Sequence, residues 1–433
     1  MALDIHNTFF PNQHIEDPKW FAGRKADIEK ALMALCRIGS SIIVYGERGV
    51  GKSSFTQMIK LLATGTPHLL YKHNFQKLYP PDKFKFKTIS TECDAECTST
   101  AKVLQRLITS PLGIKSLISS RIDTIETIIK DKQALDLLRI INFGTESENK
   151  VIRSEFKEEN IFETFTNLII TISRNLLNPN EGLLIAIDEF DLLDDSHKMA
   201  SIIKNLSKNN VKFIISGIAE SYDQLLDGHA SVARQFTFGK INITPMSFNE
   251  VADLFGIVES NSNNQVRFEE GFIKDVWEKS SGYPYFVQLF GQLALDSYVK
   301  LRGEQGSMLI HSQYLKSGLK SLGIFEHQMD KDYLAIIKEN PAKELVIKFI
   351  SSKVARRIKD EEIYSICHKH NLMPPQPKNI IASLLGHREP QFISRHTEDS
   401  DYLFFINPLF KVYVNSREPE LIRIRNNDYY IPE

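Results

Sequence analysis

Residues 46–54 read Gly-Glu-Arg-Gly-Val-Gly-Lys-Ser-Ser, which matches the phosphate-binding pattern G-x-x-x-x-G-K-[ST]. The short β-branched, apolar run of residues 41–45 precedes it, as expected for a buried parallel strand. After it, apolar residues recur at the spacing of one helix face, and this helix should end near Gly65. A strand, a glycine-rich loop and a helix in this order predict a site for nucleotide phosphates. The alternative, a glycine-rich structural turn, explains the loop but not its two flanks.

Each residue type in the loop has a physical reason. Gly46, Gly49 and Gly51 let backbone N–H groups curve around phosphate oxygens without steric clash, and the helix N-terminus adds its positive end. We expect Lys52 to reach the β- and γ-phosphates of ATP and the Ser53 hydroxyl to join a Mg²⁺ shell. The predicted nucleotide-binding loop comprises Gly46, Glu47, Arg48, Gly49, Val50, Gly51, Lys52, Ser53 and Ser54.

A second segment supports nucleotide chemistry. Residues 183–187 form a continuous apolar strand, and Asp188-Glu189-Phe190-Asp191 follows it. The carboxyl end of a buried parallel strand is where such a sheet places its ligand chemistry. We expect Asp188 to hold Mg²⁺, directly or through water, and Glu189 to orient or deprotonate the attacking water. Alone, the segment could be a solvated helix start; with the phosphate loop upstream, the acidic pair predicts ATP hydrolysis.

Length and composition are those of an ordinary globular protein. The 433 residues suggest roughly two to four domains. Charged residues make up 25% and hydrophobic residues 42%, and the net charge of −1 gives no global attraction to nucleic acid or anionic membrane. No apolar run approaches the roughly 20 residues that span a bilayer, and residues 1–7 lack signal-peptide features. We therefore expect a cytoplasmic protein without a membrane partner.

The four cysteines are Cys36, Cys93, Cys97 and Cys367. Cys93 and Cys97 form C-x-x-x-C, and Cys367 lies in the distant segment Cys-His-Lys-His. A zinc site built from both groups is an alternative, but neither spacing is usual for zinc ligands. Reduced thiols are the preferred interpretation.

The chain divides into five predicted parts: an N-terminal arm (1–19), an ATPase core (20–245) with a helical insertion at about 98–177, a helical lid (246–334), a winged helix (335–416) and a C-terminal tail (417–433). Within the core, helices are expected at 20–36, 101–108, 122–129 and 162–176, a loop at 142–160, and further strands at 84–90, 211–216 and 241–243. Strands separated by helices predict an α/β core with a parallel sheet.

The C-terminal part predicts a winged helix-turn-helix. Its expected elements are helices at 343–358, 360–370 and 378–385 and strands at 392–395 and 402–406, joined by a turn at 397–401. A helix of residues 378–385 entering a DNA groove would offer Lys378, Asn379 and Ser383, with His387 and Arg388 beyond. The strongest basic patch is Lys353, Arg356, Arg357 and Lys359, which could also be a solvated helix face. The acidic turn would repel phosphates, so binding of a protein ligand and packing on the chain's own ATPase core are equal alternatives.

Three weaker motifs accompany the phosphate loop in a fixed order: Phe-Ala-Gly-Arg at 21–24, Pro-Met-Ser-Phe-Asn-Glu at 245–250 and Gly-Tyr-Pro at 282–284. Together they resemble the P-loop ATPases that join the origin-recognition-like AAA+ group with the STAND group, over residues 20 to 415. The resemblance implies that Phe21, Gly23 and Arg24 pack near adenine and that Pro284 faces the nucleotide. Residues 281–288 lack the lid arginine usual in origin-recognition proteins, so the STAND pattern fits better.

The resemblance also implies roles for two residues around the strand at 211–216. Arg234 would contact the γ-phosphate of a neighbouring subunit as a catalytic trans finger in a homo-oligomer; the alternative is a surface arginine that caps a helix. Ser216 at the strand tip would sense the attacking water, or be a plain strand-end serine.

Two hypotheses follow for this ATP- and ADP-binding chain. One is a DNA-associated ATPase that loads or remodels something on DNA. The other is a STAND-like signalling or antiviral defence switch, which oligomerises on ATP and recruits a separate effector protein. The defence role rests on family analogy alone.

Overall fold

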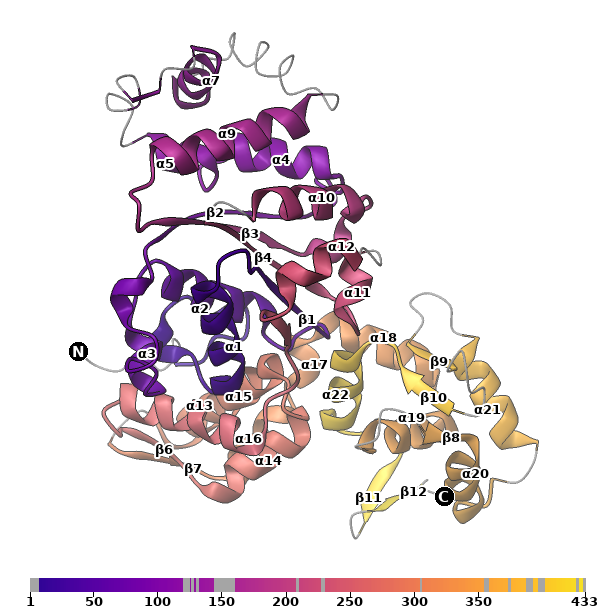
Figure 1. Ribbon diagram of the computed structural model, residues 1–433. Coiled ribbons are helices and arrows are strands. Elements are labelled where there is room, and N and C mark those ends of the chain that lie inside the picture. Colours follow the sequence, from indigo (N-terminus) through magenta and orange to yellow (C-terminus); the bar gives the residue numbers. More distant parts are fainter. Residues whose placement is uncertain are drawn as a thin grey trace. The chain divides into compact units, whose positions relative to one another are not determined.

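The computed structural model describes residues 8–119, 125, 128–129, 132–143, 160–207, 210–226, 230–303, 306–353, 358–372, 375–386, 392–395, 402–425 and 428–430 (Figure 1). The chain forms two compact units. One is continuous, His14–Thr244, and the other joins Met1–Gln13 to Pro245–Glu433. The predicted nucleotide loop and acidic pair both belong to the first unit.

The first unit is built on a five-stranded parallel sheet with the order β2-β3-β4-β1-β5. Its strands are β1 (Ile42–Gly46), β2 (Phe86–Glu92), β3 (Gly182–Asp188), β4 (Val211–Ile218) and β5 (Lys240–Asn242). In β3 every residue except the last is buried, as expected for a strand covered by helices on both faces. The predicted α/β core with a parallel sheet is confirmed. The strand β4 lies between β1 and β3, an order that the linear sequence does not specify.

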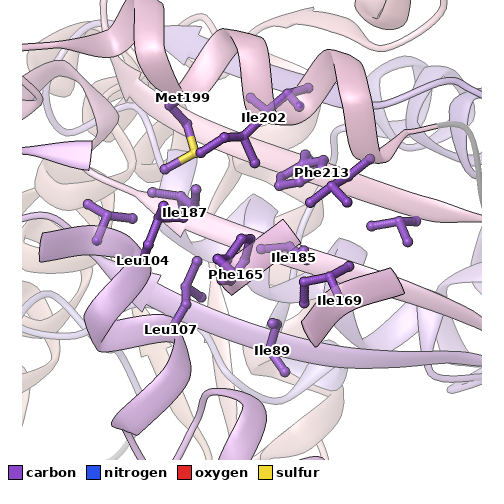
Figure 2. Close-up of a cluster of buried hydrophobic side chains, with 14 of the residues drawn as sticks. Ile89, Leu104, Leu107, Phe165, Ile169, Ile185, Ile187, Met199, Ile202 and Phe213 are labelled. Atoms are coloured by element: carbon purple, nitrogen blue, oxygen red, sulfur yellow. The ribbon is translucent and has the colours of Figure 1, made fainter. Parts of the chain in front are cut away.

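Helices cover both faces of this sheet (Figure 1). The first unit contains α1 (Lys25–Cys36), α2 (Lys52–Ala63), α3 (His68–Lys72), α4 (Thr100–Thr109), α5 (Ile114–Ile118), α7 (Lys132–Phe143), α9 (Ile161–Asn175), α10 (Ser196–Leu206), α11 (Tyr222–Leu225) and α12 (Ala230–Ala233). Figure 2 shows Leu104 and Leu107 of α4, Phe165 and Ile169 of α9, and Met199 and Ile202 of α10, gathered over strand residues Ile89, Ile185, Ile187 and Phe213. This apolar layer is the hydrophobic core on one face of the sheet.

Among its described residues the unit also has four short 3₁₀ helices: η2 (Pro18–Trp20), η3 (Pro81–Lys83), η4 (Phe190–Leu192) and η5 (Arg234–Phe236). The helix predicted from residue 20 begins later, at Lys25, because Gly23 (φ 65°) and Arg24 (φ 61°) both adopt left-handed backbone conformations. The strand predicted at 84–90 lies at Phe86–Glu92. Register with β3, from Phe86↔Gly182 to Glu92↔Asp188, fixes these bounds.

The insertion between β2 and β3 is helical as predicted, but not all of its parts can be compared. The helices predicted at 101–108 and 162–176 correspond to α4 and α9. Helices α5 and α7 were not predicted, and α7 occupies residues 142–143, where the loop was expected to begin. The predicted helix at 122–129, apart from residues 125 and 128–129, and the loop at 144–159 lie outside the described residues.

The second unit begins with helices and a small parallel sheet. Its elements are α13 (Phe248–Asn261), β6 (Val266–Phe268), α14 (Glu270–Ser280), α15 (Pro284–Arg302), β7 (Met308–Ile310), α16 (Ser312–Leu319), α17 (Leu322–Phe325) and α18 (His327–Ile337). The parallel β6–β7 pair is a correction to the purely helical pattern predicted here. Phe9, from the predicted N-terminal arm, is buried against the rings of Phe255 and Phe268, at centroid distances of 5.7 and 6.0 Å.

The C-terminal region contains α19 (Pro341–Ser352), β8 (Ile358–Lys359), α20 (Asp360–Lys369), α21 (Gln376–Leu385), β9 (Ile393–Arg395), β10 (Tyr402–Phe405), α22 (Pro408–Ser416), β11 (Arg423–Arg425) and β12 (Asp428–Tyr430). The helix predicted at 343–358 ends at Ser352, and Ile358 instead pairs with Leu403 in a three-stranded sheet, β8-β10-β9. The turn predicted at 397–401 lies outside the described residues. That these elements form a winged helix-turn-helix stays a prediction.

Two features of this region were not predicted. Helix α22 packs against α19, and the predicted tail forms the antiparallel pair β11–β12. Helices of the described part of the chain include none that is long and apolar enough to span a membrane.

Candidate nucleotide site

The phosphate loop follows directly from β1, and its first residue must be glycine. Gly46 has φ 149°, and a Cβ at this position would lie 2.2 Å from the Ile243 carbonyl oxygen. Gly51, with φ 96°, caps the start of α2 in a left-handed conformation. The loop therefore closes onto the first turn of α2 in the arrangement that the motif predicts, with backbone N–H groups at a helix N-terminus.

Lys52 is the first residue of α2 and is buried. Its Nζ donates hydrogen bonds to the carbonyl oxygens of Glu47 (2.9 Å) and Gly46 (3.3 Å). Burial lowers the pKa of Lys52, whereas the carboxylates of Glu189, Asp191 and Asp188 oppose this shift. The Lys52 ammonium group is thus hydrogen-bonded to carbonyl oxygens of its own loop. A charged phosphate oxygen is a stronger acceptor than a carbonyl oxygen and would compete for these hydrogen bonds.

Two further contacts support the loop and its helix. The guanidinium of Arg24, which is 7% exposed, donates to the Val50 carbonyl oxygen at 3.0 Å. The Ser54 hydroxyl accepts a hydrogen bond from the Ile15 N–H at 3.0 Å. Neither contact was predicted, because each joins residues distant in sequence. Arg24 therefore braces the loop in this structure, and its predicted place near adenine stays a prediction.

The remaining predicted loop and adenine residues differ in exposure. Val50 is fully buried, Arg48 is exposed, and Glu47, Gly49 and Ser53 are half-buried. Phe21 is buried, and its carbonyl oxygen accepts a hydrogen bond from Lys72 Nζ at 3.0 Å. A half-buried Ser53 beside Lys52 remains reachable from solvent, as a ligand of a bound ion must be.

The acidic residues cluster where β3 ends. The Asp188 carboxylate oxygen Oδ1 accepts hydrogen bonds from the Ser216 hydroxyl (2.6 Å) and from the Glu189 N–H (2.9 Å). Glu189 has φ 52°, a left-handed conformation that is uncommon outside glycine and that concentrates at functional sites. Burial, together with the nearby charges of Asp188 and Asp191, raises the pKa of Glu189.

The strand order explains why Ser216 meets Asp188. Because β4 lies between β1 and β3, its carboxyl end falls between the phosphate loop and the acidic turn. A serine at this tip supplies a hydroxyl to the carboxylate of the neighbouring strand. Since the strands are parallel, the phosphate loop after β1 and the acidic turn after β3 lie at one edge of the sheet.

Two further predicted site residues are Arg234 and Pro284. Arg234 is exposed at the start of η5, so its role as a trans finger stays a prediction. Pro284 is the first residue of α15 and belongs to the other unit. The turn before it is held by the Met246 N–H, which donates to the Gly282 carbonyl oxygen at 2.7 Å. Its nucleotide contact also stays a prediction.

The four cysteines are free thiols. Burial, more than any neighbouring charge, raises the pKa of Cys93 to about 12 and that of Cys367 to about 11. Within the described residues, no group of three or more histidine, cysteine or acidic side chains is arranged to hold a metal ion.

Comparison with known proteins identifies the family. The family model described as Novel STAND NTPase 1 matches residues 12–324, which is most of the chain and includes the phosphate loop and the acidic turn. The chain therefore belongs to the novel STAND NTPase 1 family and is a P-loop NTPase of the STAND and AAA+ type, as its motifs suggested. No curated protein matches the sequence.

Several solved structures are similar in outline at low identity. A Walker-type ATPase of Pyrococcus abyssi is 13% identical, with a TM-score of 0.49, and the match covers 95% of this chain and 99% of that one. The ORC1 protein of Aeropyrum pernix, solved in complex with DNA, is 12% identical, with a TM-score of 0.45 and 95% of each chain covered. The RuvB Holliday junction branch migration motor of Thermotoga maritima is 11% identical, with a TM-score of 0.39 and coverages of 92% and 97%.

Proposed function

We propose that this member of the novel STAND NTPase 1 family is a Mg²⁺-dependent ATPase that works as a nucleotide switch. The observation that carries the proposal is the strand order of the sheet, which brings the carboxyl end of β1, followed by Lys52, to the same edge as the carboxyl end of β3, with Asp188 and Glu189. Phosphoryl transfer needs a cation at the phosphates and a group that orients water, and these residues supply both.

The donor chemistry around the loop fits Mg²⁺. The Ser53 hydroxyl and the Asp188 carboxylate are hard oxygen ligands, and Mg²⁺ in nucleotide sites takes few protein ligands besides phosphates and water. Oδ1 of Asp188 already accepts two hydrogen bonds, which orients the carboxylate and leaves Oδ2 to face an ion or its water shell. When bound, Mg²⁺ would neutralise charge on the β- and γ-phosphates.

The side chains would act as follows. Lys52 moves from the Gly46 and Glu47 carbonyl oxygens to the phosphates when ATP enters. Glu189, held in a left-handed conformation beside Asp188, orients the attacking water and accepts its proton. The raised pKa of Glu189 brings this carboxylate closer to the range in which it can accept a proton effectively.

The direct test measures phosphate release from ATP by the purified full chain, with Mg²⁺ and with excess chelator. We expect release that depends on Mg²⁺, and an Asp188→Asn variant that needs roughly tenfold more Mg²⁺ for half-maximal rate, because a charged ligand becomes neutral. If the chain bound ATP tightly but released no phosphate under any condition, it would be an ATP-binding protein and not an ATPase.

We also propose that Arg234 acts in trans within an ATP-dependent homo-oligomer. Its exposure at η5 supports this, because a finger must reach a neighbouring subunit. In the test, Arg234→Ala protein is mixed with Glu189→Gln protein, each of which is expected to hydrolyse ATP far more slowly than wild type when alone. Recovery of activity on mixing is expected, since one class of mixed interface carries both intact groups. A strictly monomeric solution mass at concentrations where ATP is hydrolysed would contradict this role.

For the C-terminal region we propose association with DNA through α21, with an effector protein as the alternative ligand. The exposed residues of α21 favour DNA, because they are polar or small and none is acidic: Gln376, Lys378, Asn379, Ala382 and Ser383. Two nearby cations favour a protein ligand, since Lys353 pairs with Glu362 (3.4 Å) and Arg395 with Asp360 (2.9 Å). Charges that are already paired gain less from phosphates.

DNA binding measured across a range of salt concentrations separates these alternatives. Contacts to several phosphates predict an affinity that falls steeply with salt, and Lys378→Ala should reduce that slope by about 1. Weak binding with no salt dependence would favour an effector protein, consistent with a STAND-type signalling or defence role.

A further inference from the structure

The tip of strand β4 lies between the two halves of the nucleotide site and is held differently on its two sides. On one side, β4 pairs with β1 up to Ile218↔Gly46, so it ends opposite the first residue of the phosphate loop. On the other side, the ladder with β3 stops at Ile187↔Ile215. Residues 216–218 therefore extend beyond their backbone pairing with β3.

Side chains of the acidic turn continue the contact where the ladder stops. The Ser216 hydroxyl donates to Asp188 Oδ1 at 2.6 Å, and the Ile218 N–H donates to Asp191 Oδ1 at 2.8 Å. The second bond takes a backbone donor of the exposed Ile218, which has no β3 residue opposite it in the ladder. The Asp191 carboxylate therefore supplies a hydrogen bond at the end of β4, where the ladder with β3 has stopped.

The backbone of residue 217 is shaped around the same carboxylate. A Cβ on Gly217 would lie 2.8 Å from Asp191 Oδ1, 2.9 Å from the Asp191 nitrogen and 2.9 Å from Leu225 Cδ2. No side chain fits without displacing the turn, so Gly217 and Asp191 form a matched pair. Oδ1 of Asp191 is engaged with the strand and is directed at β4.

We propose that Asp191 is a positioning residue that holds the tip of β4 on the acidic turn, so that Ser216 keeps its hydrogen bond to Asp188 and Glu189 keeps its position at the end of β3. The proposal rests on the proposed ATP hydrolysis and adds a residue to it. Nucleotide binding is expected to be independent of this lock, because β1 is also held by β5 and by the Ile243 N–H, which donates to the Tyr45 carbonyl oxygen at 2.8 Å.

The test separates the length of the side chain, which sets the position of its acceptor oxygen, from its charge. Three substitutions at Asp191 are assayed for kcat and for ATP affinity in the full chain. Asp191→Asn keeps an acceptor oxygen at the same reach and loses the charge, so we expect kcat within about threefold of wild type. Asp191→Glu keeps the charge and changes the reach, and Asp191→Ala removes both. Both should lower kcat roughly tenfold with little change in ATP affinity, because small misplacements of catalytic groups are costly.

Two further variants complete the design. Gly217→Ala should reproduce the fall in kcat by displacing the turn while leaving Asp191 intact. Asp194→Ala, at an exposed carboxylate of the same segment, is the matched control and should behave as wild type. The proposal would be overturned if Asp191→Ala had the kcat of wild type. It would also be overturned if Asp191→Glu stayed active while Asp191→Asn lost as much kcat as Asp191→Ala, because charge and not position would then matter. If Asp191→Ala fails to fold, the Asn and Glu variants decide alone.

Hydrogen exchange at the Ile218 amide tests whether Asp191 holds the tip of β4, and it does not depend on ATP turnover. Exchange should be faster in Asp191→Ala than in wild type and slow again in Asp191→Asn. If wild type releases no phosphate, the proposed function fails, and this exchange pattern still reports whether Asp191 holds β4. If the exchange rate of the Ile218 amide were the same in Asp191→Ala as in wild type, Asp191 would not hold the tip of β4.

Discussion

Two buried polar clusters, one in each unit, differ in how their charges are satisfied. At the candidate nucleotide site, the hydrogen bonds of Lys52 within the described part of the chain go to the carbonyl oxygens of its own loop, residues 46 and 47. In the C-terminal region, the fully buried Lys348 donates to the carbonyl oxygens of Val414 and Arg417, more than sixty residues away. The first lysine is held locally, and the second ties two distant segments together.

The acidic members differ in the same way. Glu344 is fully buried, accepts hydrogen bonds from the backbone N–H groups of Glu420, Leu421 and Ile422, and also accepts one from the Tyr333 hydroxyl. Glu189 is half-buried, strained and next to other carboxylates. Burial of a charge therefore does not by itself indicate a ligand site. A cluster closed by its own chain stabilises the fold, whereas one with spare bonding capacity can bind a ligand.

The largest effect should come from the closed cluster. Glu344→Ala leaves three backbone N–H groups and Lys348 without their acceptor or counter-charge, and it should lower the free energy of unfolding by about 3–5 kcal/mol. Urea unfolding of the full chain measures this. The exposed Glu361→Ala is the control and should stay within about 0.5 kcal/mol. If Glu344→Ala lowered ATP affinity without changing the free energy of unfolding, the structural role assigned to the Glu344 cluster would be wrong.

At the open cluster, Glu189→Gln should reduce ATP turnover by roughly 10²-fold while ATP stays bound. The amide keeps the shape of the side chain and loses the charge that orients the water. Single-turnover hydrolysis and equilibrium ATP binding, measured on the same protein, separate the two effects. Turnover at the wild-type rate would remove Glu189 from its proposed role.

Lys52→Ala should weaken ATP binding by roughly tenfold or more, since it removes the mobile cation expected at the β- and γ-phosphates. Its stability should change little, in contrast to Glu344→Ala. Lys30→Ala, at an exposed lysine of α1, is the control for loss of a positive charge. Unchanged ATP affinity in Lys52→Ala would refute the assignment of the phosphate loop.

The smallest effect is a pH dependence of stability from Lys348. Burial lowers its pKa to about 7 from 10.5, with Arg417 and Lys279 adding to the shift and Glu344 and Glu418 opposing it. Between these values the unfolded chain binds more protons, so this lysine makes stability rise with pH above about 7 and has no such effect below it. Relative to Lys348→Met, wild type should gain about 1 kcal/mol in unfolding free energy from about pH 7.5 to about pH 8.5. An equal response of both proteins would show that Lys348 does not titrate there.

Local sequence predicted the structural elements at the candidate nucleotide site, because each element is encoded over a few consecutive residues. The phosphate loop, the apolar strands β1, β3 and β4, and the acidic turn after β3 could be found in this way. Glycines specify their own backbone angles, and an unbroken apolar run specifies a strand buried on both faces. The helix start at Lys25 was missed because Gly23 and Arg24 adopt left-handed angles that the hydrophobic pattern does not report.

The C-terminal region was predicted less well for a different reason. Ile358 continues the apolar pattern of the helix before it, yet it lies in β8 because Leu403 pairs with it from forty-five residues later. The β6–β7 pair is likewise short on both sides, at Val266–Phe268 and Met308–Ile310. Strands of this length gain their stability from the partner strand, so neither shows a strong pattern of its own.

The sequence by itself determined that this chain has a glycine-rich phosphate-loop motif, an acidic turn after an apolar strand and a parallel α/β core, because these depend on residue types at fixed, short spacing. Tertiary structure alone decided that β4 separates β1 from β3, that Ser216 bonds to Asp188, that Asp191 holds Ile218, and that Glu344 and Lys348 fasten the C-terminal segment. Each of these contacts joins residues far apart in sequence. Their pairing is selected by the packing of the whole unit, and no local pattern records it.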